Sequence, residues 1–312
     1  MTRRQQSTCG MALALIASAG CTPDAPTASG APKSVAVVGA RATFLDVTYA
    51  PKSNQEKLDL YLPPPATALA PLVIWIHGGA FTVGDKSYIT FDDSGPAPQP
   101  TSHLGPYQVQ HPDVSALLAK GYAVASLNYR LEGHANVFVA GGRGCGGCAG
   151  SALDAGRDAK AAVRFLRANA SQYGLDPDRF AVWGNSAGGY MVTVLGVTGD
   201  QSTTFDDPSL GNMMVSSAVQ AVIDWYGVML MGEASPMTYI ATAHTLPPFF
   251  IEHGSADQSV NVSVSSTLQA ALVQRGAQST LTIIPGAGHE DHAFSATQLP
   301  ACYAFIDQAL GR

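Results

Sequence analysis

Charged residues are scarce in this sequence, since only 13% of its 312 residues are Asp, Glu, Lys or Arg. The 17 Lys and Arg residues are scattered along the chain, and the formal net charge is -6. A protein that binds nucleic acid needs a basic patch that neutralises phosphates, and this pattern supplies none. We therefore expect no nucleic acid partner.

Long apolar runs are also lacking at the N-terminus, where MALALIASAG (residues 11–20) is too short to span a bilayer. Arg3 and Arg4 precede it, and a positive start followed by a short apolar segment is typical of a signal peptide. Residues 17–19 (ASA) match a cleavage site, whereas residues 18–21 (SAGC) resemble a bacterial lipobox with serine where leucine is more usual. The sequence therefore leaves two forms of processing open, ordinary signal-peptide cleavage and lipidation of a cysteine.

The domain organisation follows from this start. We expect residues 1–21 to be a signal peptide of the lipoprotein type, with a lipid on Cys21 that attaches an exported bacterial protein to a membrane. Ordinary secretion or a periplasmic location stays open, as does an uncleaved cytoplasmic start. Residues 22–40 are rich in Pro, Ala, Ser and Thr, which predicts a flexible linker. Residues 41–312 are then one folded domain of ordinary size.

Cysteine is scarce as well, because beyond Cys9 and Cys21 only Cys145, Cys148 and Cys302 remain. A zinc site built on the C-x-x-C of Cys145 and Cys148 would need a second pair of ligands at similar spacing, which the sequence does not offer. In an exported protein we expect one disulfide and one leftover thiol, with the pairing open. No metal or other cofactor is predicted.

Eight apolar runs rich in β-branched residues alternate with helical patterns. Several runs are continuous rather than alternating, which is typical of strands covered on both faces. The pattern predicts an α/β fold with a mostly parallel sheet of about eight strands, helices on both faces and an antiparallel start. The runs are FLDVTY, KLDLYL, PLVIWIH, YAVASLNY, RFAVWG, AVIDWYG, PFFIEHG and TLTIIPG.

Two helices are predicted over residues 154–174 and 260–276, because both segments carry an apolar stripe and end in glycine. Residues 91–112 and 131–151 do not fit the alternation, since they are rich in Gly, Pro and polar residues. Ligands of parallel sheets bind beyond the carboxyl ends of the strands, so we expect these two long loops to form the rim of the site.

Ser186 lies in GNSAG, which matches G-x-S-x-G, between a predicted strand and a predicted helix. In this context a serine held on a tight, strained turn is a nucleophile. The alternative is that Ser186 only caps the helix. A nucleophilic serine needs a base, and the base needs a carboxylate that orients it.

Asp257 and His289 supply these groups, because each lies in a short loop after a predicted strand. The chain order Ser, Asp, His is that of α/β-hydrolases. Asp224 is a rival for the acid, since it ends another strand, and His292 in HEDH is a rival for the base. HEDH could also ligate a metal, but no second cluster supports that interpretation.

The segment HGGAF (residues 77–81) ends another predicted strand. Together, HGGAF, GNSAGG, HGSADQSV and GAGHEDH resemble four signatures of α/β-hydrolase esterases, near the hormone-sensitive-lipase-like and bacterial feruloyl-esterase-like (BD-FAE) groups. The likeness covers about residues 42–310. It implies that the backbone N–H groups of Gly79, Ala80 and Ala187 form the oxyanion hole, although the family usually has glycine where this chain has Ala80. His77 is then expected to hold the loop in place rather than act as a base.

The sequence therefore predicts a serine carboxylesterase, with Ser186 as nucleophile, His289 as base and Asp257 as the orienting acid. The resemblance implies short-chain acyl or hydroxycinnamoyl esters as substrates, either small molecules or linked to polysaccharides. Two other functions stay open: a serine peptidase of the prolyl-oligopeptidase type, and a non-catalytic, lipid-anchored binding protein on a hydrolase scaffold. The natural ester and the oligomeric state are left undetermined.

Overall fold

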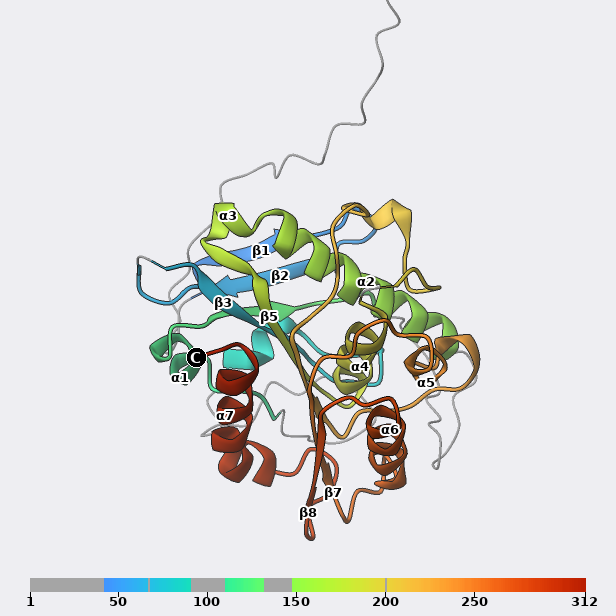
Figure 1. The fold of residues 1–312 in the computed structure, drawn as a ribbon. Helices are drawn as coiled ribbons and strands as arrows, with labels where there is room; N and C mark the ends of the chain where they lie inside the picture. Colours follow the sequence, from blue (N-terminus) through green and yellow to red (C-terminus); the bar gives the residue numbers. More distant parts are fainter. Residues whose placement is uncertain (1–41, 67, 91–109, 132–147, 200) are drawn as a thin grey trace, which may run out of the picture.

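A computed structural model describes residues 42–66, 68–90, 110–131, 148–199 and 201–312 (Figure 1). The predicted signal peptide and linker lie outside these residues, as do most of the two long loops. The strands are β1 (Phe44–Thr48), β2 (Lys57–Tyr61), β3 (Ala70–Ile76), β4 (Ala123–Leu127), β5 (Leu175–Asn185), β6 (Ala221–Trp225), β7 (Phe249–Gly254) and β8 (Ser279–Ile284). The helices are α1 (Val114–Ala119), α2 (Cys148–Ala168), α3 (Ala170–Tyr173), α4 (Ala187–Thr198), α5 (Met237–Ile240), α6 (Ser263–Gln274) and α7 (Leu299–Ala309). Short helical turns are η1 (Lys86–Thr90), η2 (Pro208–Leu210), η3 (Gly232–Ala234) and η4 (Phe294–Gln298).

All eight predicted apolar runs form strands, and these strands make one sheet in the order β1-β2-β4-β3-β5-β6-β7-β8. The first two strands pair antiparallel with each other, and β2 is also antiparallel to β4. Every pair from β4 to β8 is parallel. The mostly parallel sheet with an antiparallel start is confirmed.

The sheet is buried on both faces because most positions of its central strands are apolar, and in β3 all of them are. In β3, Leu72, Ile74 and Ile76 pack into one core, and Val73 and Trp75 pack into the other. Successive side chains of a strand point to opposite faces, so a continuous apolar run fills two cores at once. Helices α2, α4 and α6 cover the first face, while α1 and α7 cover the second (Figure 1).

Two predicted boundaries were wrong. Helix α2 begins at Cys148, inside the segment predicted to be a loop up to residue 151, because its apolar stripe of small residues continues with the buried Ala152. Strand β5 begins at Leu175, four residues before the predicted run RFAVWG. Leu175 pairs with Ala70 of β3, and a register irregularity separates that pair from the next. The glycine cap is confirmed, since Gly174 ends α3 with φ 68°.

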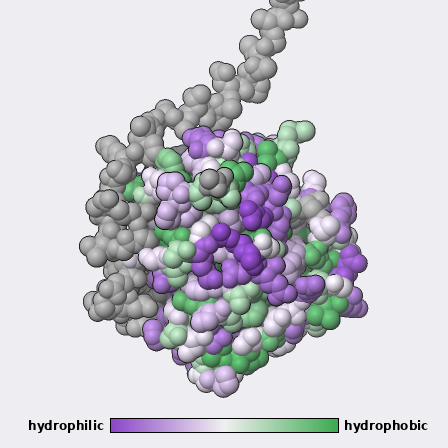
Figure 2. Space-filling model, turned by 60° about the vertical axis from the view of Figure 1, so that its left-hand side comes forward, coloured by the Kyte–Doolittle hydropathy of each residue, from purple (hydrophilic) through white to green (hydrophobic). Residues whose placement is uncertain are grey.

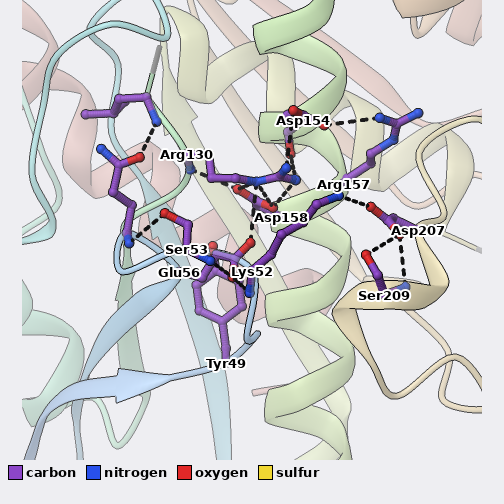
Figure 3. Close-up of polar contacts among 12 residues, drawn as sticks. Tyr49, Lys52, Ser53, Glu56, Arg130, Asp154, Arg157, Asp158, Asp207 and Ser209 are labelled. Carbon is purple, nitrogen blue, oxygen red and sulfur yellow. Dashed lines mark hydrogen bonds and ion pairs between the residues drawn. The ribbon is translucent and has the colours of Figure 1, made fainter. Parts of the chain in front are cut away.

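A buried ionic cluster joins the first strands to α2 (Figure 3). Arg130, which follows β4, lies 2.7 Å from Asp158, 3.2 Å from Asp154 and 3.4 Å from Glu56. The side chains of Glu56 and Asp158 are fully buried. Burial raises the pKa of Asp158 to about 6, although hydrogen bonds from Arg130 lower it. Arg130 therefore links the loop between β1 and β2, which carries Glu56, to helix α2, which carries Asp158.

The sheet order places a switch point at β3. Strand β4 lies on one side of β3 and β5 on the other. The connections that leave the carboxyl ends of β3 and β5 therefore diverge, and the space between them is where open α/β sheets bind ligands. His77 to Phe81 follow β3, and Ser186 follows β5. The fold thus brings the first two predicted motifs to one edge of the sheet.

The surface of the described residues is mixed in character. On the face drawn in Figure 2, hydrophobic residues are interspersed with hydrophilic ones, which gather around a hollow near the centre of the view. None of the helices in the described ranges combines the length and the apolar composition that crossing a bilayer requires.

Candidate active site

Ser186 occupies a sharp turn between β5 and α4. Its backbone has φ 54° and ψ -114°, a conformation that non-glycine residues rarely adopt. The flanking glycines are required by space, because a Cβ atom on Gly184 would lie 2.5 Å from the backbone of Gly188. Ser186 stands at the N-cap position of α4, yet its side chain makes no capping hydrogen bond. The helix-cap interpretation of this serine is therefore not supported.

The hydroxyl of Ser186 instead faces an imidazole. Its Oγ lies 3.0 Å from Nε2 of His289, and Nδ1 of His289 lies 2.7 Å from Oδ2 of Asp257. A carboxylate only accepts, so Nδ1 carries the proton and Nε2 accepts from the hydroxyl. The three side chains, which come from loops after β5, β7 and β8, form one continuous chain of hydrogen bonds.

Asp257 is held by several donors. Its Oδ1 accepts hydrogen bonds of 2.8 Å from the backbone N–H groups of Ser259 and Val260. Its Oδ2 accepts from His289 and lies 3.2 Å from Nε2 of His253. Burial raises the pKa of Asp257, but the hydrogen bonds from His253 and His289 outweigh burial and leave that pKa well below its usual range. This carboxylate stays ionised at neutral pH, as an orienting acid must.

Asp224 and His292, the alternative acid and base from the sequence, are not members of this hydrogen-bonded chain. Asp224 accepts hydrogen bonds from the backbone N–H of Gly227 at 2.8 Å and from the hydroxyl of Thr193 at 3.1 Å. Burial raises the pKa of Asp224 to about 7. The imidazole that contacts Ser186 is that of His289, three residues before His292. Among the described residues, no cluster of His, Cys, Asp and Glu could hold a metal ion.

The loop after β3 has the backbone shape that presents N–H groups. Gly79 has φ 108° and Ala80 has φ 54°, so Ala80 adopts the left-handed geometry that the usual glycine would. The loop is fixed to the serine turn, since the backbone N–H of Gly78 donates to Oδ1 of Asn185 at 2.7 Å. Ala187 is the first residue of α4, where backbone N–H groups have no acceptor within the helix. The structure thus fixes the loop that contains Gly79 and Ala80 to the serine turn through Gly78, and Ala187 directly follows Ser186.

His77 is a buried residue of this loop. Its Nδ1–H donates to the carbonyl of Gly78 at 2.7 Å, and its ring stacks on Tyr129 at 4.6 Å between centroids. The hydroxyl of Tyr129 donates to the carbonyl of His77 at 3.0 Å. Burial lowers the pKa of His77, which keeps the ring neutral. As expected, His77 holds the loop and does not face Ser186.

Tyr226 was missed by sequence reasoning. Its ring meets that of His289 edge-on, with centroids 4.7 Å apart, and also packs on Phe294 at 4.5 Å. Nδ2 of Asn185 donates to its hydroxyl at 3.3 Å. Tyr226 has φ 41°, an unusual value for a tyrosine, but the letters AVIDWYG carry no signal of this strain.

The cysteines are only partly described. Cys302 is a free, buried thiol in α7, and it lies 3.3 Å from Oε2 of Glu252. Burial raises the pKa of the Cys302 thiol well above its ordinary value. The C-x-x-C of Cys145 and Cys148 lies outside the side chains that are described, so the predicted disulfide and its pairing stay a prediction.

Comparisons with known proteins identify families and relatives that this chain resembles. The BD-FAE family model matches residues 150–232, and the dienelactone hydrolase family model matches residues 211–305. Esterase LipQ of Mycobacterium tuberculosis is 25% identical over 283 residues, which cover 78% of this chain and 56% of LipQ. The chain spans about half the length of the curated relatives it matches.

Solved structures share the fold. A truncated carbohydrate esterase from gut microbiota superposes with a TM-score of 0.63 at 23% identity, covering 86% of this chain and 96% of that one. A propionate-bound esterase, Est2, of Thermogutta terrifontis gives 0.61 at 21% identity, covering 87% and 92%. The chain therefore has the fold of these solved esterases, and its sequence is similar to those of esterases.

Proposed function

We propose that this chain is a serine carboxylesterase that works through an acyl-enzyme. The observation that carries the proposal is the hydrogen-bonded chain from Ser186 through His289 to Asp257, next to the backbone donors of Gly79 and Ala80. A nucleophile, a base, an oriented acid and an oxyanion hole are the parts that acyl transfer needs.

Acylation begins when Oγ of Ser186 attacks the carbonyl carbon of the ester and passes its proton to Nε2 of His289. The carbonyl oxygen becomes an oxyanion, which accepts hydrogen bonds from the backbone N–H groups of Gly79, Ala80 and Ala187. The bond to the alcohol then breaks, and the imidazolium returns its proton to the departing oxygen. Asp257 stabilises the imidazolium without taking the proton.

Deacylation repeats these steps with water as the nucleophile. His289 takes a proton from the water, which attacks the acyl carbon, and the second oxyanion occupies the same donors. The carbon–oxygen bond to Ser186 breaks, and the proton returns to Oγ. The acid is released and the serine is regenerated. Each donor in such a hole contributes roughly 3 to 4 kcal/mol to transition-state stabilisation in measured cases.

The substrates proposed are short-chain acyl or hydroxycinnamoyl esters. The likeness to the BD-FAE model supports the hydroxycinnamoyl class. The propionate-bound neighbour supports a short acyl group, and the neighbour named as a carbohydrate esterase supports an alcohol that belongs to a saccharide. The two classes differ in the acyl group alone, so one substrate series can separate them.

The test is hydrolysis of p-nitrophenyl esters from acetate to palmitate, together with methyl ferulate, by the purified protein. We expect turnover of short chains or of the ferulate, a burst of p-nitrophenol equal to the enzyme concentration, and loss of both in Ser186→Ala. Ser209→Ala, at an exposed serine of η2, is the matched control and keeps full activity. A folded wild-type protein that turns over no ester would contradict the proposal and favour a peptidase or a binding protein.

A further inference from the structure

A second imidazole contacts the acid of the proposed triad. His253 lies near the end of β7 and is fully buried. Its Nε2 lies 3.2 Å from Oδ2 of Asp257 and 3.0 Å from the carbonyl oxygen of Val260. Its Nδ1 lies 2.7 Å from Oγ of Ser265, a buried residue of α6. Both ring nitrogens therefore have partners within the protein.

The partners determine where the ring carries its proton. Nε2 faces a carboxylate oxygen and a carbonyl oxygen, and both of these only accept. Nε2 must therefore carry the proton, and in a neutral ring Nδ1 accepts from the hydroxyl of Ser265. These two acceptors thus select the tautomer of His253 that carries its proton on Nε2, and Ser265 complements that tautomer by donating to Nδ1.

The two imidazoles meet at the same oxygen atom. Oδ2 of Asp257 accepts from Nδ1–H of His289 and lies 3.2 Å from Nε2 of His253, whose N–H it shares with the carbonyl of Val260, while backbone N–H groups hold Oδ1. A carboxylate held at both oxygens cannot rotate, so Oδ2 stays aimed at His289. The negative charge on Oδ2 is shared between two donors, which limits how strongly it attracts the imidazolium of His289.

Resting on the proposed function, we propose that His253, oriented by Ser265, is a positioning residue of this active site. It fixes the Asp257 oxygen that orients His289, and it shares the charge of that oxygen. Hydrogen-bonded neighbours that orient a reacting group are general in enzyme sites, and their loss costs activity through misplacement.

Two other carboxyl groups face this pair. Asp224 on the neighbouring strand β6 interacts electrostatically with His253. Glu290 interacts with Asp257, and burial together with the charge of Asp257 raises the pKa of Glu290 to about 8. His253 and Asp257 therefore lie close to two further carboxyl groups. Among these groups, Asp257 is the one that must stay ionised at neutral pH.

The alternative role for His253 is packing alone, since the ring fills space beneath the loop. Two substitutions at this residue separate packing from hydrogen bonding. His253→Leu fills similar volume without a donor, whereas His253→Gln places an amide N–H near the position of Nε2. Ser265→Ala removes the hydroxyl that donates to Nδ1 and leaves the ring in place.

The experiment measures kcat, KM and the pH profile of kcat/KM on the best p-nitrophenyl ester, with thermal unfolding of every variant. Leu272→Ala is the matched control, because Leu272 is a fully buried residue of the same helix as Ser265 and touches no triad residue. It lowers the midpoint of thermal unfolding, because it leaves a cavity in the core. It should leave kcat and the pH profile unchanged.

In His253→Leu we expect kcat to fall about tenfold to a hundredfold, with KM within about threefold of wild type. The acid-side midpoint of the profile should rise by about half a pH unit, because Asp257 then attracts the imidazolium more strongly. His253→Gln should restore most of kcat, and Ser265→Ala should show a smaller change in the same direction.

A folded His253→Leu protein with wild-type kcat and midpoint would overturn the inference, as would a midpoint that moves down. Equal losses in His253→Leu and His253→Gln that follow the loss of stability would assign His253 to packing. Ser186→Ala separates the two proposals. If it stays active, the proposed function itself fails, whereas an inactive Ser186→Ala beside an unaffected His253→Leu removes only the role of His253.

Discussion

Gly188 approaches Ile76 so closely that a Cβ atom on residue 188 would lie 1.9 Å from the carbonyl oxygen of Ile76. Ile76 ends β3, just before the loop of Gly79 and Ala80, and Gly188 is in the first turn of α4, just after Ser186. This backbone contact therefore sets the distance between the nucleophile and the oxyanion donors. The last glycine of G-x-S-x-G is required by space, and that requirement is also what builds the site.

Gly188→Ala should disrupt this contact. No side chain can move aside, because the obstructing atoms belong to the backbone of Ile76. Overpacking of this kind costs roughly 3 kcal/mol or more in unfolding free energy. We expect the variant to unfold at lower urea concentration and to lose most of its esterase activity.

Gly288→Ala is the control for Gly188→Ala, because no atom lies within 4 Å of a Cβ built on Gly288. Its unfolding free energy should stay within about 0.5 kcal/mol of wild type. Equal midpoints for Gly188→Ala and Gly288→Ala in urea would show that the approach to Ile76 is not tight in solution.

Ala80 pays a conformational penalty that glycine would not. Its φ of 54° lies in the left-handed region, which costs an L-residue roughly 1 to 2 kcal/mol. Glycine also loses more entropy on folding, so Ala80→Gly should raise stability by about 1 kcal/mol or less. Because the backbone N–H remains, kcat should be unchanged. Urea unfolding and ester kinetics measure the two effects.

Ala80→Val tests the same geometry in the opposite direction. A β-branched residue is a true outlier at positive φ, so the loop should shift and carry its N–H away from the oxyanion. We expect kcat to fall at least tenfold while KM changes little, since the donors act mainly in the transition state. A fully active Ala80→Val would remove Ala80 from the oxyanion hole.

The two buried aspartates should behave differently in activity assays. Asp257→Asn leaves the site in place but offers an amide to Nδ1 of His289, which favours the wrong tautomer. A loss of about 10⁴ in kcat is the precedent for such a change in serine proteases. Asp224→Asn should keep kcat within about threefold, because Asp224 contacts Gly227 and Thr193 rather than His289. The reverse ranking would assign the orienting role to Asp224.

Sequence reasoning succeeded where the signal is local. Apolar runs gave all eight strands, and Ser186, Asp257 and His289 were found because each directly follows a strand of a parallel sheet, whose carboxyl ends lie at one edge. Residues whose roles depend on distant partners were not found. Tyr226 contacts His289 from a different loop, and no pattern near it marks that contact.

His253 shows the same limit. The letters HGSAD place it at the end of a predicted strand, just before Asp257, and do not indicate its partners. Its Nε2 lies close to the same oxygen of Asp257 as Nδ1 of His289. This arrangement depends on the course of residues 254–260 and on Ser265, which lies on a helix. Arg130 likewise has partners on two other elements, which sequence spacing does not reveal.

Arg130→Met should be among the most destabilising substitutions outside the site. It leaves the buried Glu56 and Asp158 without their cation, a change that costs roughly 3 to 5 kcal/mol. The loss should shrink below about pH 6, because Asp158, whose pKa is raised by burial to about 6, can then take up a proton. Urea unfolding at pH 5 and pH 8 measures the difference.

Arg179→Met is the control for Arg130→Met. Arg179 pairs with Asp176 at 2.6 Å, but both side chains are partly exposed, so the pair contributes at most about 1 kcal/mol. If Arg130→Met cost no more than Arg179→Met, the cluster in Figure 3 would not hold the first strands to α2.

Asp224 should make the protein less stable as the pH rises. Its pKa is raised by burial from 3.8 to about 7, so between these values the unfolded chain has lost a proton that the folded protein keeps. The folded state then binds more protons, and its stability falls with rising pH by at most about 1.4 kcal/mol per pH unit until the pH passes 7.

Asp224→Asn removes this dependence and keeps an acceptor for Gly227. The difference in unfolding free energy between variant and wild type should therefore grow in favour of the variant from pH 4.5 to pH 7.5. A difference that stays constant over that range would mean that Asp224 is ionised in the folded protein, and that its hydrogen bonds from Gly227 and Thr193 outweigh its burial.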